Sequence, residues 1–151
     1  MTLTPNDRLA QHVVELAQAF GVMLQVTHSL LPHEAGAGYP KEDEHLPPPQ
    51  RRKLVLIAPV RDETTYAVAL HELGHCLHPL GSCGSTEGSL EMRLTNRYST
   101  LRDIRLQLLE EESAWEWARH YALEWTDVMT YVQTISTESY RRTAHRFGVR
   151  T

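Results

Sequence analysis

The 151-residue sequence predicts a single α+β domain. Apolar residues recur at helical spacing in several long stretches, and two shorter stretches in the first half have the apolar patterns of strands. The chain contains no internal repeat and no linker long enough to divide it, and a chain of this length can bury one core. We therefore expect residues 1–151 to form one domain with an N-terminal helix, a small twisted sheet and a helical C-terminal half.

The first half of the chain is predicted to form a helix, two strands and a long loop. Thr4 to Phe20 has helical periodicity, and Gly21 ends that helix. Val22 to Leu30 is predicted to be a strand because apolar residues alternate at its start. Leu31 to Arg52 contains five prolines and a charged run, which predicts a loop. Lys53 to Ala58 is a short apolar run typical of a buried strand.

The second half of the chain is predicted to be helical. Asp62 to Thr65 can cap a helix, and the Gly/Ser-rich segment from Gly81 to Gly88 predicts a flexible loop. Four helices are expected: Thr65–Leu77, Ser99–Glu124, Thr126–Tyr131 and Ser136–Phe147.

Composition and charge exclude several classes of protein. The net charge is −4, whereas a nucleic-acid-binding surface usually needs a strongly basic balance, so we expect no nucleic-acid partner. Two cysteines do not make a disulfide framework. No apolar run approaches the roughly 20 residues that span a bilayer, and the first residues lack the pattern of a secretory signal. We expect a cytoplasmic protein without a membrane partner.

One short motif carries the predicted chemistry: His71-Glu72-Leu73-Gly74-His75. On a helix, residues four apart lie on one face about 6 Å apart along the axis, so both imidazoles can reach one metal ion. Glu72 cannot comfortably bind the same ion, but it can reach a metal-bound water and act as general base. Zinc lowers the pKa of such a water towards about 7 and polarises a carbonyl. The motif predicts a zinc-dependent hydrolase; the alternative is a helix with two histidines and no metal.

A third protein ligand is needed, and three adjacent glutamates compete for this role. Periodicity places Glu111 on the apolar stripe of the second long helix, whereas Glu112 lines up with a solvent face and Glu110 lies near the boundary. A carboxylate on a core face is costly unless it is paired or bound to metal, so we predict Glu111 as the ligand. The alternatives are a salt bridge from Glu111 to an arginine such as Arg102, and Glu91 as the ligand.

Structural roles are expected for the other polar groups near the motif. His78 lies about 10 Å along the axis from His71, too far to share one ion, and is expected to be a supporting or surface residue. Cys76 and Cys83 are expected to be a buried thiol and a loop thiol rather than a second metal site with His78. The tryptophans of the second long helix are expected in the core. The basic stretch 141–146 is expected on a solvated helix face.

The chain resembles the gluzincins, which are zinc peptidases with His-Glu-x-x-His and a later Glu, and within them the small ImmA/IrrE-type family. A metzincin is excluded because positions 78 and 81 are His and Gly rather than Gly and His. The family often has a small polar residue where this chain has Trp115. The resemblance covers roughly residues 50–125 and rests on His71-Glu72-Leu73-Gly74-His75, on His78, on a strand followed by a helix, and on Glu111-x-x-Ala114-x-x-x-Ala118.

The resemblance implies a zincin-like fold with Zn²⁺ bound by His71, His75 and Glu111, and with Glu72 as the base. It also implies intracellular protein or peptide substrates, often transcriptional repressors. Candidates for the residue that stabilises the oxyanion are Tyr98, His120 and Tyr121. Two rival functions remain open. One is a non-catalytic metal-binding sensor or regulator that keeps the fold and binds a protein partner; the other is a structural or nucleic-acid-binding protein with a fortuitous motif.

The predicted strand from Lys53 to Ala58 directly precedes the metal helix. If one of its edges is open, its unpaired backbone groups could accept an extended peptide as an added strand. The loops at 31–52 and 81–88 could then cover the cleft. The alternative is a fully paired strand with both loops as plain surface connections.

Overall fold

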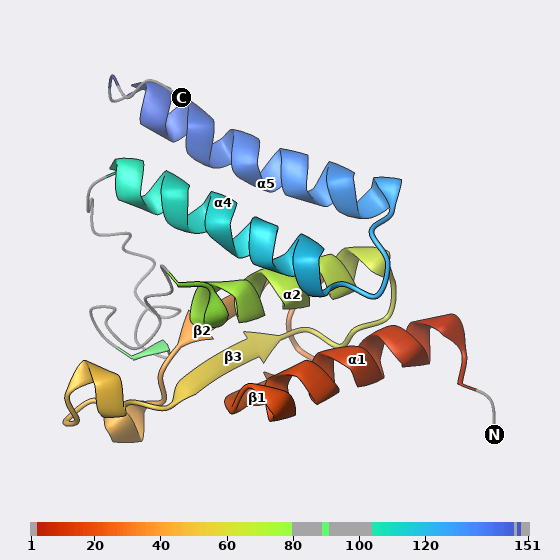
Figure 1. Cartoon of the computed structure of the whole chain (residues 1–151), viewed down its shortest axis with the longest axis horizontal. Coiled ribbons are helices and arrows are strands. Elements are labelled where there is room, and N and C mark those ends of the chain that lie inside the picture. Colours follow the sequence, from red (N-terminus) through yellow and green to blue (C-terminus); the bar gives the residue numbers. More distant parts are fainter. Residues whose placement is uncertain (1–2, 80–88, 91–103, 147, 149–151) are drawn as a thin grey trace.

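The computed structural model describes residues 3–79, 89–90, 104–146 and 148. Within these residues, four helices and a three-stranded sheet form an α+β architecture, as predicted (Figure 1). The elements in chain order are α1 (Pro5–Ala19), β1 (Val22–Val26), β2 (Ala35–Gly38), β3 (Lys53–Ile57), α2 (Glu63–Leu77), α4 (Ile104–Tyr121) and α5 (Asp127–Arg146). Two short 3-10 turns, Lys41–Asp43 and Pro48–Gln50, lie between β2 and β3.

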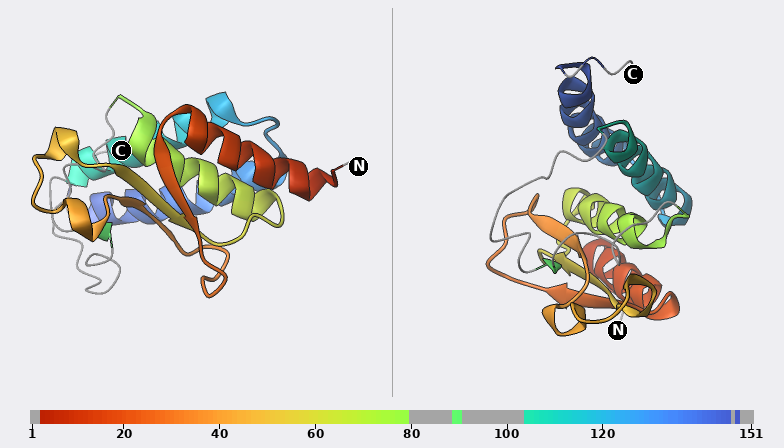
Figure 2. Two further views of the ribbon diagram at one scale, coloured as in Figure 1. Left: turned by 90° about the horizontal axis from the view of Figure 1, so that it is seen from below. Right: turned by 90° about the vertical axis from the view of Figure 1, so that its left-hand side faces the viewer.

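β3 is the central strand of the sheet. β1 pairs with it in parallel, and β2 pairs with it in antiparallel orientation on the other side. This strand is therefore fully paired, which was the alternative, and the hypothesis that one of its edges receives a peptide is wrong. α1 and α2 lie on the same face of the sheet, and α4 and α5 pack beyond α2 (Figure 2). This arrangement encloses α2 between the sheet and the two C-terminal helices.

The hydrophobic core surrounds α2. One cluster of buried side chains joins α1, the sheet, α2, α4 and α5. Within α2, Tyr66, Ala67, Leu70 and Leu73 are fully buried. A helix that is apolar on most sides is a buried helix rather than a surface helix. The motif His71–His75 therefore lies on a helix that is buried against the sheet and the other helices.

The start of α2 is defined by a capping box. The Asp62 carboxylate accepts a hydrogen bond from the Thr65 amide at 2.8 Å, and the Thr65 hydroxyl accepts from the Asp62 amide at 3.1 Å. This reciprocal pair satisfies two backbone donors that a helix start otherwise leaves free. The helix begins at Glu63, two residues before the predicted start, because Asp62 is its N-cap.

Three predictions differ from the structure. The segment predicted as a loop contains β2, whose sequence Ala-Gly-Ala-Gly lacks the β-branched and aromatic residues that indicate strands. The two short helices predicted at 126–131 and 136–147 are one continuous helix, α5. Its middle is rich in β-branched residues with low helix propensity, but Met129, Thr137 and Ala144 are buried, and tertiary packing outweighs propensity. β1 also ends at Val26, earlier than predicted.

Side-chain contacts give the segment between β2 and β3 a defined conformation. The Arg52 guanidinium and amide donate hydrogen bonds of 2.8–3.3 Å to the buried Asp43 carboxylate. These bonds hold the pKa of Asp43 at about 2, well below its usual 3.8. The Arg51 guanidinium lies 4.2 Å from the centre of the Tyr39 ring and donates a hydrogen bond to the Leu46 carbonyl.

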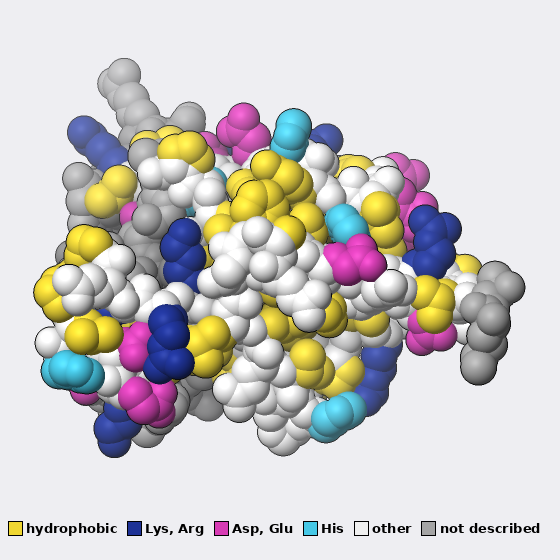
Figure 3. All heavy atoms as spheres, turned by 60° about the horizontal axis from the view of Figure 1, so that its bottom comes forward, with side chains coloured by type: hydrophobic (Ala, Val, Ile, Leu, Met, Phe, Trp, Pro, Cys, Tyr) yellow, Lys and Arg dark blue, Asp and Glu magenta, His cyan; other side chains and the backbone are white. Residues whose placement is uncertain are grey.

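The surface carries charges of both signs. On the face drawn in Figure 3, Lys and Arg side chains are intermixed with Asp and Glu side chains. No helix in the described part of the chain is long and apolar enough to cross a membrane.

Candidate metal centre

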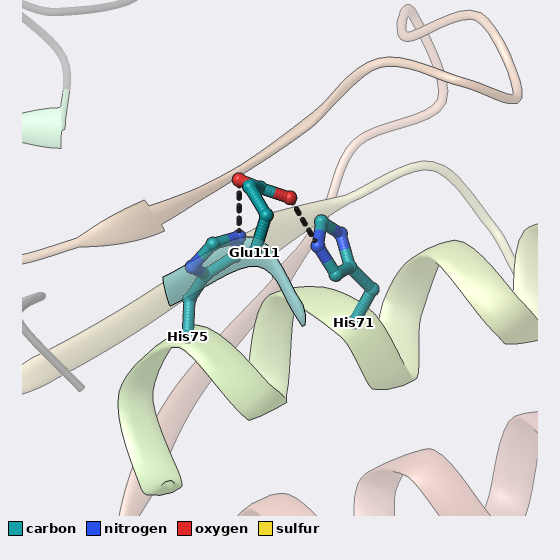
Figure 4. Close-up of side chains that lie close together, drawn as sticks. All are labelled: His71, His75 and Glu111. Carbon is teal, nitrogen blue, oxygen red and sulfur yellow. Dashed lines mark hydrogen bonds and ion pairs between the residues drawn. The ribbon is translucent and has the colours of Figure 1, made fainter. Parts of the chain in front are cut away.

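The structure brings His71, His75 and Glu111 together. Both histidines project from one face of α2, and the Glu111 carboxylate enters from α4 and lies between their rings (Figure 4). One Glu111 oxygen is 2.7 Å from His71 Nε2, and the other is 2.9 Å from His75 Nε2. The polar side-chain atoms of these three residues therefore lie close together, although the residues are up to 40 positions apart in the sequence.

A close approach of two helices makes this convergence geometrically possible. An ideal Cβ at Gly74 would collide with the Ala114 carbonyl oxygen and would lie 2.9 Å from Ala114 Cα. The absent side chain thus lets α4 lie directly against α2. Glu111 is one helical turn before Ala114, so it reaches the turn of α2 that carries both histidines.

These three side chains can hold a metal ion. Their candidate ligand atoms all lie within 4.8 Å of one another, and Glu111 and His71 are buried. Two imidazoles and one carboxylate form a donor set that suits zinc and other borderline divalent metals. Ligand atoms around a tetrahedral zinc lie about 3.3 Å apart, given metal–ligand distances of roughly 2.0–2.1 Å. The present spacings of 2.7 and 2.9 Å join the two histidines to different oxygens of Glu111, so the side chains would have to move apart slightly around a bound ion.

The buried carboxylate and imidazole stabilise each other's charge. Burial alone lowers the pKa of His71, but the hydrogen bond to Glu111 and the nearby Glu72 carboxylate outweigh it and raise that pKa to about 9. Burial raises the pKa of Glu111, whereas the two histidines lower it further, so the net shift is downward. Glu111 is therefore an anion at neutral pH, which is the protonation state a metal ligand needs.

The other two glutamates of the triplet are less suitable. Glu111 is 7% exposed, whereas Glu112 lies on the solvent side of α4 and pairs with Arg141 at 3.4 Å. Glu110 is partly exposed and is not among the residues whose ligand atoms gather at the centre. The helical periodicity of α4 therefore placed the carboxylates on the correct faces.

Glu72 lies at the edge of this group without joining it. Its carboxylate oxygen Oε1 is 3.6 Å from His71 Nδ1, on the ring edge opposite the nitrogen that faces Glu111. Glu72 is largely buried, and it lines a cleft that opens beside the metal centre. A carboxylate in this position can accept a proton from a molecule bound in the cleft.

Trp115 has a role that the sequence did not reveal. Its indole stacks on the His71 imidazole with ring centres 4.2 Å apart and an angle of 14° between the planes. Its Nε1 is buried and has no hydrogen-bond partner within the described residues. Trp115 was predicted to be a core residue, and it is buried, but it also forms one wall of the site. Helical periodicity can predict the face of a side chain but not the orientation of its ring.

The remaining candidates lie elsewhere. The ring of His78 is buried, and burial together with the nearby His75 lowers its pKa. Tyr121 stacks on Trp117 and contacts Phe20, so it is directed towards α1. Exposed His120 lies nine residues, or about 14 Å, beyond Glu111 along α4. Neither is placed to stabilise an oxyanion at this centre. Four residues considered in the sequence analysis lie outside the described ranges: Cys83, Glu91, Tyr98 and Arg102.

A cleft of about 470 Å³ adjoins the metal centre. Its walls come from α2, α4, α5 and the segment that contains β2. The lining residues are His33, Ala35, Val68, His71, Glu72, Trp115, Tyr131, Val132, Ile135, Ser136 and Tyr140. A volume of this size is in the range of small-ligand sites.

Comparison with known proteins gives no match: no family model, no curated protein and no solved structure is significantly similar to this chain.

Proposed function

We propose that this protein is a zinc-dependent peptidase of the gluzincin type, resembling the small ImmA/IrrE-type family. The observation that carries the proposal is the position of the buried Glu111 carboxylate between the Nε2 atoms of His71 and His75. A buried carboxylate is costly unless it is paired or binds a metal, and two imidazoles facing it complete a ligand set. The described residues thus supply three candidate ligands and one candidate base.

In the proposed reaction, His71, His75 and Glu111 hold the zinc ion. When bound, zinc lowers the pKa of a coordinated water and polarises the carbonyl of the peptide bond. Glu72 accepts the proton from the attacking water and then delivers it to the leaving amine. The cleft next to Glu72 holds the substrate, and the wall formed by Trp115 limits the access of bulk water to His71.

The proposed substrates are proteins or peptides within the cell, such as a transcriptional repressor. This part of the proposal rests on the resemblance. A non-catalytic sensor that binds a protein partner is the alternative function, and it has no need of a carboxylate at position 72. The two functions differ in one measurable property, which is peptide cleavage dependent on Glu72.

The test combines metal analysis with a protease assay. Elemental analysis of the purified protein should find about one zinc per chain. Glu72→Gln should keep the fold and the zinc but abolish cleavage of an unfolded protein substrate, because only the proton acceptor is lost. Glu63→Gln is the matched control, since Glu63 lies on the same helix two turns before His71. Zinc binding without any cleavage by the wild-type protein would favour the sensor, and cleavage at the wild-type rate by Glu72→Gln would overturn the mechanism.

A further inference from the structure

The cleft beside the metal centre has an apolar side that the proposed chemistry does not use. His71 and Glu72 of α2 line the cleft. Five further lining residues belong to α5: Tyr131, Val132, Ile135, Ser136 and Tyr140. These positions recur at intervals of about four residues, so they lie on one face of the helix. α5 therefore turns a mainly apolar face towards the cleft.

Several of these apolar side chains are unusually exposed. Tyr131 is 65% exposed and Ile135 is 56% exposed, whereas Val132 packs partly against the core. Large apolar side chains that are grouped at a concave site are typical of ligand-binding positions. Val68 of α2 and Ala35 of β2 complete the apolar lining.

The charges around the cleft restrict what it can bind. Glu72 is the one acidic residue among the described lining residues, and that lining has no Lys or Arg. An acidic group bound on the α5 side would be repelled by Glu72, and the described lining residues include no Lys or Arg to pair with it. An apolar group would instead remove the exposed side chains of Tyr131 and Ile135 from water.

We propose that the α5 side of this cleft is a specificity pocket that takes an apolar side chain, branched or aromatic, of the substrate residue next to the cleaved bond. This inference rests on the proposed function, because the cleft shares His71 and Glu72 with the metal centre. The pocket selects apolar residues by burial and rejects acidic residues by repulsion from Glu72. Ile135 sets the depth of the pocket, and Tyr131 forms part of its rim.

The first experiment measures cleavage preference. Unfolded proteins are digested with the zinc-loaded enzyme, and the residues on both sides of every cut are identified by mass spectrometry. An apolar residue should recur at one position next to the cut, and acidic residues should be depleted there. Ile135→Trp should lower kcat/KM at least tenfold for substrates with a large residue at that position, whereas Ile135→Ala should shift the preference towards larger residues.

Val128 provides the matched control. It is an exposed apolar residue on α5, two turns before Ile135, and it does not line the cleft. Val128→Trp and Val128→Ala should leave the preference unchanged. Cleavage with no residue preference, or a preference that the Ile135 variants do not alter, would overturn the pocket while leaving the peptidase in place.

A binding experiment tests the pocket even if no cleavage is found. N-acetyl-phenylalanine amide and N-acetyl-aspartic acid amide are titrated into the protein, and the indole N–H signal of Trp115 is followed by NMR. The signal is assigned with Trp115→Phe. The phenylalanine compound should shift it in the wild type and should bind at least tenfold more weakly to Ile135→Trp; the aspartate compound should not shift it. An absence of binding by the phenylalanine compound would overturn the pocket independently of any enzymatic activity.

Discussion

Gly74 of α2 lies so close to the backbone of Ala114 in α4 that no side-chain carbon fits between them. This contact sets the distance between the helix that carries the two histidines and the helix that carries Glu111. The colliding atoms are the carbonyl oxygen and Cα of Ala114, which cannot move without moving α4.

The first prediction concerns this contact. Gly74→Ala gains about 1 kcal/mol in helix propensity, but overpacking costs roughly 1–3 kcal/mol and should dominate. We expect a lower melting temperature and weaker metal binding, because separating the helices also withdraws Glu111. Calorimetry and metal titration measure both effects.

A second substitution sharpens this test. Ala114→Gly removes a side chain but leaves the colliding backbone atoms in place, so it should not rescue Gly74→Ala. Full rescue in the double variant would show that the contact between the helices is made by side chains, contrary to the structure.

The second prediction concerns the choice of carboxylate. Glu111→Gln removes the negative charge between His71 and His75 and should weaken zinc binding by more than the roughly 10–100-fold that changes in supporting residues cost. Glu110→Gln and Glu112→Gln keep the buried carboxylate and should bind zinc like the wild type. Competition with a chelator gives the three dissociation constants. Equal constants for all three variants would assign the third ligand to another residue.

The third prediction concerns the ring that stacks on His71. Aromatic pairs contribute about 0.5–1.5 kcal/mol, so Trp115→Leu should weaken metal binding by up to about tenfold, and Trp115→Phe should recover part of the loss. Metal binding should also change the fluorescence of Trp115, because its indole lies 4.2 Å from the ring of a metal ligand. Trp117→Phe is the control: Trp117 stacks on Tyr121 instead, and the metal-dependent signal should persist.

The fourth prediction concerns a hydrogen-bonded junction of α1, α2 and the end of α4. The buried Tyr66 hydroxyl accepts from the Leu123 amide at 3.0 Å and lies 2.6 Å from His12 Nδ1, to which it donates when His12 is neutral. Tyr66→Phe removes both hydrogen bonds and should cost roughly 1–3 kcal/mol in the free energy of unfolding. Tyr131→Phe, which alters an exposed hydroxyl, should cost little by comparison.

We also expect the free energy of unfolding to depend on pH because of His12 at this junction. Burial lowers the pKa of His12 below its usual 6.5, and Glu15 offsets this effect only in part. The stabilisation from neutral His12 is fully present above about pH 6.5. This stabilisation is lost as the pH falls from about 6.5 through the lower pKa that His12 has in the folded protein. The reason is that His12 takes up a proton at a higher pH in the unfolded chain than in the folded one. Urea unfolding between pH 7.5 and 5 should show a smaller loss of stability in His12→Asn than in the wild type.

Helical periodicity explains why most of the site could be predicted from the sequence. The spacing of His71 and His75 and the apolar stripe around Glu111 are local features of single helices, and they survive folding unchanged. Each of these predictions depends on residues within a few turns of one helix.

The features that could not be predicted depend on contacts between distant segments. β2 is a strand because the backbone of Ala35–Gly38 pairs with β3, and its small side chains carry no pattern that shows this. α5 continues through its β-branched middle because it packs against α4 and α2. The lining of the cleft beside Glu72 includes residues of α5, so it depends on how α5 packs in the fold. A local sequence pattern could therefore not predict it.

The capping box at Asp62 and Thr65 fixes where α2 begins, and therefore how many helical residues precede the proposed metal ligands His71 and His75. Each residue of a helix advances the chain by 100° and about 1.5 Å. Inserting one residue between Thr65 and His71 would therefore turn both imidazoles away from Glu111 by more than a quarter of a revolution, even if the helix stayed intact. Substitutions between Asp62 and His71 are therefore compatible with this site, whereas insertions and deletions there are not.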